Sequence, residues 1–162
     1  MVSAEGQVAI AIQPQHRAYV QGQPPQHVAL TEWADALLIA PLSANSLAKV
    51  SSGLCDNIVT RTARAWPLTP PAKPFVVAPA MNTKMWDHAV TAAQMKTLES
   101  WGVLVAAPIA KLLACGDLGV GAMAAVPDIV SCLVAACGAA AAENGHHCAA
   151  SCGAAAAENG RH

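Results

Sequence analysis

Three apolar runs of the sequence end in the pair Ala-Pro, at residues 40–41, 78–79 and 107–108. In parallel α/β sheets, ligands bind beyond the carboxyl ends of the strands, so we expect the segments that follow these runs to meet at one site. Those segments carry small and polar residues: Ser43, Asn45 and Ser46 after the first run, Met81 and Asn82 after the second, and residues 111–123 after the third. Ser43 has a second interpretation, because serine at such a position also caps a helix.

The third segment combines a cysteine with several glycines. Cys115 is followed by Gly116, Gly119 and Gly121, a composition suited to a mobile flap that closes over a ligand. A lone cysteine is more often a buried structural thiol, so both interpretations stay open from composition alone.

The elements that must position these residues alternate between short apolar runs and helical segments. We expect strands at 36–41, 75–79 and 103–108, and helices at 44–50, 56–66, 88–101 and 127–136. Continuous apolar strands separated by helices are typical of a parallel α/β sheet with helices on its faces.

The two ends of the chain differ in composition from the part between them. Residues 1–26 are rich in Gln and Pro, which disfavours regular structure, although Val8-Ala9-Ile10-Ala11-Ile12 could form one short strand. The nine-residue segment at 137–145 recurs at 152–160, so we expect an Ala-rich low-complexity tail at 137–162. The predicted domain is therefore 27–136.

Composition limits the classes of partner and the location. The formal net charge is −1 and no basic run occurs, which leaves little to attract nucleic acid. The longest weakly polar stretch, 129–142, is shorter than the roughly 20 residues that a membrane-spanning helix needs. We expect no membrane association and, since the N-terminus does not resemble a secretory signal, a cytoplasmic protein.

The six cysteines are expected to be thiols rather than disulfides in that compartment. Cys55, Cys132 and Cys137 have no ligand spacing around them and are interpreted as small apolar residues. His146, His147, Cys148 and Cys152 have zinc-binding chemistry, but their place in a repeated Ala tract favours low complexity, so we predict no metal site.

Several motifs carry a resemblance to a known family. The segment Pro79-Ala80-Met81-Asn82-Thr83-Lys84-Met85-Trp86 matches the P-x-M-N-x-x-M-W signature of the homo-oligomeric flavin-containing cysteine decarboxylases. Segments starting at His27, Ala40, Gly53 and Ala114 occur in the order found in the phosphopantothenoylcysteine decarboxylase branch of that family. The resemblance covers about residues 27–130.

The resemblance implies a Rossmann-like, flavodoxin-like three-layer fold with a parallel sheet, and an FMN-binding trimer. The implied reaction is the decarboxylation of 4'-phospho-N-pantothenoylcysteine to 4'-phosphopantetheine in coenzyme A synthesis. The cofactor would carry the redox chemistry, oxidising the thiol end of the substrate so that carbon dioxide leaves more easily.

The resemblance also assigns roles to residues. His27 corresponds to the active-site histidine, a residue type suited to proton transfer, and Asn82 to the residue that holds the substrate carboxylate. Cys115 corresponds to the cysteine that protonates the aminoenethiolate intermediate. The remaining assignments are substrate contacts at Leu112 and Ala114, and FMN contacts at Ser43, Ala44, Asn45, Ser46 and Ala80.

One part of the family pattern is missing from this sequence. The family opens with a strand that ends in a Gly-Ser-Val/Ile-Ala-type turn for the FMN phosphate, and residues 1–26 contain no such turn. We therefore expect the first strands of the fold to be missing and keep a second function open: a non-catalytic regulatory or partner subunit, phosphatase-inhibitor-like or part of a mixed trimer. A third possibility, a relative acting on peptides that end in cysteine, is disfavoured by the segment Ala114-Cys115-Gly116-Asp117.

Overall fold

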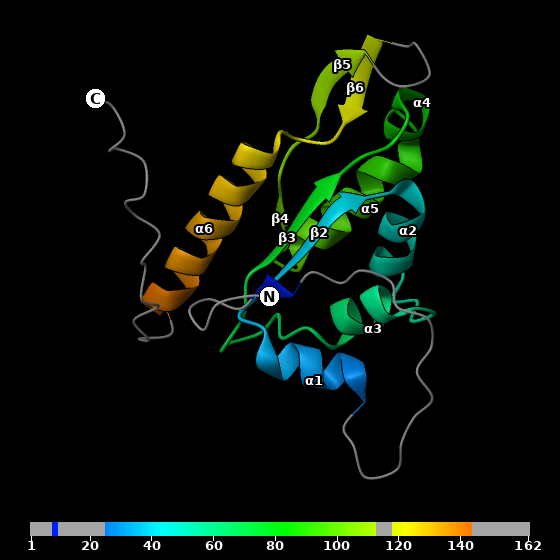
Figure 1. The fold of residues 1–162 in the computed structure, drawn as a ribbon. Helices are drawn as coiled ribbons and strands as arrows, with labels where there is room; N and C mark the ends of the chain where they lie inside the picture. Colours follow the sequence, from blue (N-terminus) through cyan, green and yellow to red (C-terminus); the bar gives the residue numbers. More distant parts are fainter. Residues whose placement is uncertain (1–7, 10–24, 113–117, 144–162) are drawn as a thin grey trace, which may run out of the picture.

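The structure is a computed structural model, and it describes residues 8–9, 25–112 and 118–143. Its strands form a four-stranded main sheet with helices on both faces and a separate two-stranded hairpin beyond one end of it (Figure 1). In chain order they are β1 (Val8–Ala9), α1 (Gln26–Trp33), β2 (Ala36–Leu42), α2 (Ala44–Ser51), α3 (Ile58–Ala65), β3 (Phe75–Pro79), α4 (Thr83–Trp86), α5 (Ala89–Ser100), β4 (Leu104–Val105), β5 (Ile109–Leu112), β6 (Leu118–Ala122) and α6 (Val126–Glu143).

The main sheet is parallel and has the order β1-β2-β3-β4. Its two faces are built by alternate residues of the same strands, since successive side chains of a strand point to opposite sides. Leu37 and Val77 pack with Leu98 in the core between the sheet and the helices α2, α3 and α5. Val76 packs on the opposite face against Leu133 of α6. The layers are thus helix, sheet and helix, which confirms the predicted flavodoxin-like three-layer fold (Figure 1).

The predicted strands at 36–41 and 75–79 are confirmed as β2 and β3. The third strand is shorter than the predicted 103–108, because β4 pairs with β3 over Leu104–Val105 only. The Ala106 N–H still donates to the Val77 carbonyl oxygen at 2.9 Å, so the chain continues along the sheet beyond the strand.

Further features differ from the sequence-based expectation. Helices α1 and α4 were not predicted. The glycine-rich segment is not a plain loop, because β5 and β6 pair in it as an antiparallel hairpin. Helix α6 continues to Glu143, well past the predicted end at 136, because its last turns are rich in alanine, the residue with the highest helix propensity.

Candidate functional site

The N-terminus of α2 lies beyond the carboxyl end of β2. Ser43 caps this helix, because its Oγ accepts a hydrogen bond from the Ser46 N–H at 3.2 Å, so the helix-cap interpretation is confirmed. The backbone N–H groups of Ala44 and Asn45 have no acceptor among the described residues. Such N–H groups at the start of a helix bind polar or anionic ligand atoms. The predicted residues of the first loop therefore lie together at the expected edge of the sheet.

The turn after β3 is joined to the end of β2. The Ala80 N–H donates to the Leu42 carbonyl oxygen at 2.9 Å, and the side chain of Met81 is buried beneath the turn. Asn82 caps α4, because its Oδ1 accepts a hydrogen bond from the Lys84 N–H at 2.9 Å. This cap places the Asn82 carboxamide at the same edge as the N-terminus of α2.

The hairpin of β5 and β6 packs directly on the Asn82 turn. The Met81 N–H donates to the Gly121 carbonyl oxygen at 2.9 Å. A Cβ at Gly121 would lie 2.3 Å from the Met81 carbonyl oxygen, and one at Gly119 would lie 2.4 Å from Thr83 Oγ1. Only glycine allows β6 to approach the turn this closely. The two glycines thus fix the hairpin over the segment that follows β3.

The loop of this hairpin falls on 113–117, so Ala114 and Cys115 lie outside the described residues. Leu112 is the last residue of β5, and its backbone pairs with Leu118 of β6. The loop therefore begins and ends on a hairpin that is anchored next to Asn82.

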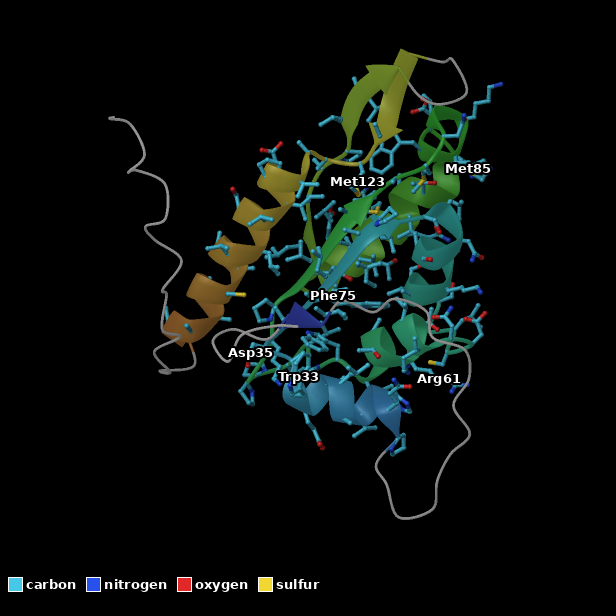
Figure 2. All side chains as sticks on the ribbon, in the orientation of Figure 1. Trp33, Asp35, Arg61, Phe75, Met85 and Met123 are labelled. Atoms are coloured by element: carbon cyan, nitrogen blue, oxygen red, sulfur yellow. The ribbon has the colours of Figure 1, made fainter. Side chains whose placement is uncertain are left out.

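His27 lies at the other end of the sheet. It is the second residue of α1, the helix that precedes the start of β2. It lines a pocket with Cys55 and Arg61, which follow the C-terminal end of α2, whereas the N-terminus of α2 lies at the edge that carries Asn82. In Figure 2, Arg61 lies close to α1 and Met85 lies toward the opposite end of the sheet. Within one chain the structure therefore brings together the predicted cofactor residues and Asn82, but not His27.

A pocket of about 320 Å³ is lined by His27, Cys55, Arg61, Arg64 and Ala65. Of the three cysteines interpreted as small apolar residues, Cys55 is exposed, whereas Cys132 and Cys137 pack against a core cluster. Arg61 and Arg64 were not singled out from the sequence. Their spacing of three residues on a predicted helix is the signal that could have placed them on one face.

Helix α1 is held in place by the side chain of Lys73. Its Nζ donates to the carbonyl oxygens of Thr31, Glu32 and Ala34 at 2.9, 3.1 and 2.8 Å. The ammonium lies 5.9 Å from the centre of the Trp66 ring, whose Nε1 donates to the Lys73 carbonyl oxygen at 3.1 Å. A positive charge at the C-terminal end of a helix is favourable, because the last carbonyl groups carry partial negative charge.

The carboxylate next to Cys55 in the sequence is already paired. Asp56 accepts a hydrogen bond from the Lys49 ammonium, which holds the pKa of the carboxyl below its usual value. Thr60 and Asn57 also donate to its oxygens. The negative charge of Asp56 is thus engaged with Lys49 rather than with the arginines of the pocket.

The described part of the chain contains neither a metal-binding cluster nor a membrane-spanning helix. No cluster of three His, Cys, Asp or Glu side chains there could hold a metal ion, and the zinc-type residues of the tail lie outside it. No described helix is both long and apolar enough to cross a membrane.

The residues at the carboxyl edge fit the flavin and ribityl part of FMN. The unpaired N–H groups of Ala44 and Asn45, with the exposed side chains of Ser43 and Asn45, supply donors that match the carbonyl and hydroxyl oxygens of such a ligand. Thr83 Oγ1 is a further polar atom here, buried and without a hydrogen-bond partner in the described structure.

The chain is similar in sequence to proteins named phosphopantothenoylcysteine decarboxylase. Phosphopantothenoylcysteine decarboxylase from Mus musculus is 48% identical over 111 residues, which cover 68% of this chain and 53% of the mouse protein. The enzyme of the same name from Arabidopsis thaliana is 52% identical over 103 residues, covering 64% of this chain and 48% of the plant protein. The chain therefore spans about half the length of the curated relatives it matches.

Solved structures agree with these relatives. A PPC decarboxylase mutant complexed with pantothenoylaminoethenethiol matches with a TM-score of 0.66 at 47% identity, covering 73% of this chain and 63% of that one. The FMN binding protein AtHal3 matches with a TM-score of 0.65, also at 47% identity, covering 73% and 62%. Residues 7–138 match the Flavoprotein family as a whole. The chain thus belongs to the Flavoprotein family.

Proposed function

We propose that this chain takes part in the FMN-dependent decarboxylation of 4'-phospho-N-pantothenoylcysteine to 4'-phosphopantetheine. The observation that carries the proposal is the meeting of three segments beyond the carboxyl ends of β2 and β3: the N-terminus of α2, the Asn82 turn and the hairpin anchored through Gly121. The relatives named as this decarboxylase support the assignment.

Each segment has a role in this reaction. The Asn82 carboxamide donates to the substrate carboxylate and keeps the scissile bond oriented. Bound FMN would supply the oxidation of the cysteine thiol end of the substrate and the later return of the electrons. Its binding residues are Ser43, Ala44, Asn45, Ser46 and Ala80. By resemblance to the family, Leu112 and Ala114 contact the substrate, and Cys115 donates a proton to the product-forming intermediate.

The position of His27 calls for more than one copy of the chain. Because His27 lines a pocket with Cys55 and Arg61 at one end of the sheet and Asn82 follows β3 at the other end, we infer that one chain does not place both side chains on one substrate. We propose a trimer in which the histidine of one copy completes the site of its neighbour. We propose the cytoplasm as the site of this reaction, because the described cysteines, Cys55, Cys132 and Cys137, are free thiols.

The test is the absorbance spectrum of the purified chain with added FMN, followed by a decarboxylation assay. We expect flavin absorbance to co-elute with a trimer and carbon dioxide to be released from the substrate. Cys115→Ser should retain the early steps but lose product release by at least a hundredfold, the lower range for removal of a proton donor. Cys132→Ser is the matched control, because this thiol packs beside the Ala36 and Val76 cluster of α6 and the sheet.

A second candidate function has support from the same separation of His27 from Asn82. A chain whose site is incomplete on its own suits a non-catalytic partner subunit in a mixed trimer. A colourless chain that releases no carbon dioxide, yet joins a full-length relative, would replace the enzymatic proposal with this one.

A further inference from the structure

The pocket at the amino ends of the strands collects positively charged side chains. Arg61 and Arg64 lie one helical turn apart on α3 and face the start of α1, where His27 contributes the third basic side chain of the lining. Among the described residues, the lining contains no carboxylate. No ion pair to either arginine occurs in the described part of the chain.

The Arg61 side chain is oriented by a hydrogen bond that uses one of its donors. Its Nε donates to the Cys55 carbonyl oxygen at 3.1 Å, which fixes the guanidinium against the loop before α3. The four remaining N–H bonds of the group belong to the terminal nitrogens. Guanidinium groups present such donors in a fork that matches the oxygens of carboxylate and phosphate groups.

The N-terminus of α1 lies beside the same pocket, because His27, the second residue of the helix, lines it. No side chain caps this helix, and its first turn contains no acidic residue. The N–H groups of Gln26 and His27 have no acceptor among the described residues, because the Pro25 carbonyl oxygen accepts from Val28 and Ala29 instead. An uncapped N-terminus favours a negatively charged ligand group. It therefore adds, independently of the arginines, to the preference of the pocket for an anion.

We propose that this pocket binds the oxyanion group of a ligand, a phosphate monoester or a carboxylate, through Arg61, Arg64 and the first N–H groups of α1. The inference rests on the proposed function for the identity of the ligand, because the proposed substrate carries both groups, a phosphate at one end and a carboxylate at the other.

The test compares three ligands by isothermal titration of the full chain in phosphate-free buffer. 4'-Phosphopantetheine carries the phosphate alone, N-pantothenoylcysteine carries the carboxylate alone, and pantetheine carries neither. We expect one of the two anionic ligands to bind at least tenfold more tightly than pantetheine, and the identity of that ligand tells which end of the substrate occupies the pocket.

Variants of the two arginines test whether the pocket causes the tighter binding of the anionic ligand. The double variant Arg61→Gln with Arg64→Gln should lose the preference, and Arg61→Lys with Arg64→Lys, which keeps the charge, should retain part of it. Lys96→Gln removes one positive charge, half of what the double variant removes, from an exposed position on α5 and should retain all of the preference. Equal binding of all three ligands, or a preference that survives in the double glutamine variant, overturns the inference.

Flavin absorbance, and carbon dioxide release from the proposed substrate, are measured on the same protein preparations. Loss of both in the wild-type chain with the anion preference intact would remove the proposed function and leave the pocket assignment standing. Flavin absorbance and carbon dioxide release without any anion preference would overturn the pocket assignment alone.

Discussion

Replacing Lys73 by methionine should destabilise the protein by about 3 kcal/mol. Two of its three hydrogen bonds, to Thr31 and Ala34, are partly buried, and the third, to Glu32, is exposed. Hydrogen bonds to a charged group contribute about 1.5–3 kcal/mol each, and we take the lower limit for the two partly buried ones because they share one ammonium. Methionine keeps most of the apolar stem, so the loss reports on the ammonium.

Urea unfolding followed by far-ultraviolet circular dichroism measures this loss. The matched control is Lys96→Met, which removes an ammonium from an exposed position and should change the free energy of unfolding by less than about 0.5 kcal/mol. Amide hydrogen exchange adds a local measurement, since α1 should lose protection before the sheet does. Equal unfolding midpoints for the two variants would refute the argument that Lys73 holds the C-terminal end of α1.

Two further substitutions test local features of the fold. Asp56→Asn should make the free energy of unfolding less dependent on pH under acidic conditions. The pKa of Asp56 is lowered by the Lys49 hydrogen bond, so its contribution is present above the usual carboxyl pKa of about 4 and is lost as the pH falls through the lower folded value. Urea midpoints at a series of acidic pH values check this, and an unchanged profile would contradict it. Gly121→Ala should cost about 2 kcal/mol or more and loosen the hairpin, because the added Cβ would lie 2.3 Å from the Met81 carbonyl oxygen at a φ of +143°. Limited proteolysis of the hairpin measures the loosening, with Gly138→Ala, which meets no atom within 4 Å, as the harmless control.

The main sheet and the edge that carries the candidate site could be predicted from the sequence. Strands β2 and β3 are continuous apolar runs bounded by prolines, and Ser43 and Asn82 are residue types that begin helices. The hairpin could not be predicted, because Gly119 and Gly121 lower strand propensity and the packing that selects them lies on a turn distant in the sequence.

The location of His27 also could not be predicted from the sequence. A motif gives the order of residues along the chain and not the end of the sheet at which each one lies. Helix α1 is held by Lys73, some forty residues away along the chain, through hydrogen bonds to backbone carbonyl groups. Because every residue has a backbone carbonyl group, the sequence does not indicate which ones Lys73 contacts. Long-range contacts of this kind depend on the completed fold.

The placement of His27 and Asn82 at opposite ends of the sheet has a genetic consequence. In the trimer proposed above, each site would take its histidine from one copy and its asparagine from another. Two different defective alleles, one altered at His27 and one at Asn82, would then assemble some sites from two intact halves, and a cell carrying both would regain part of the activity that either allele alone lacks.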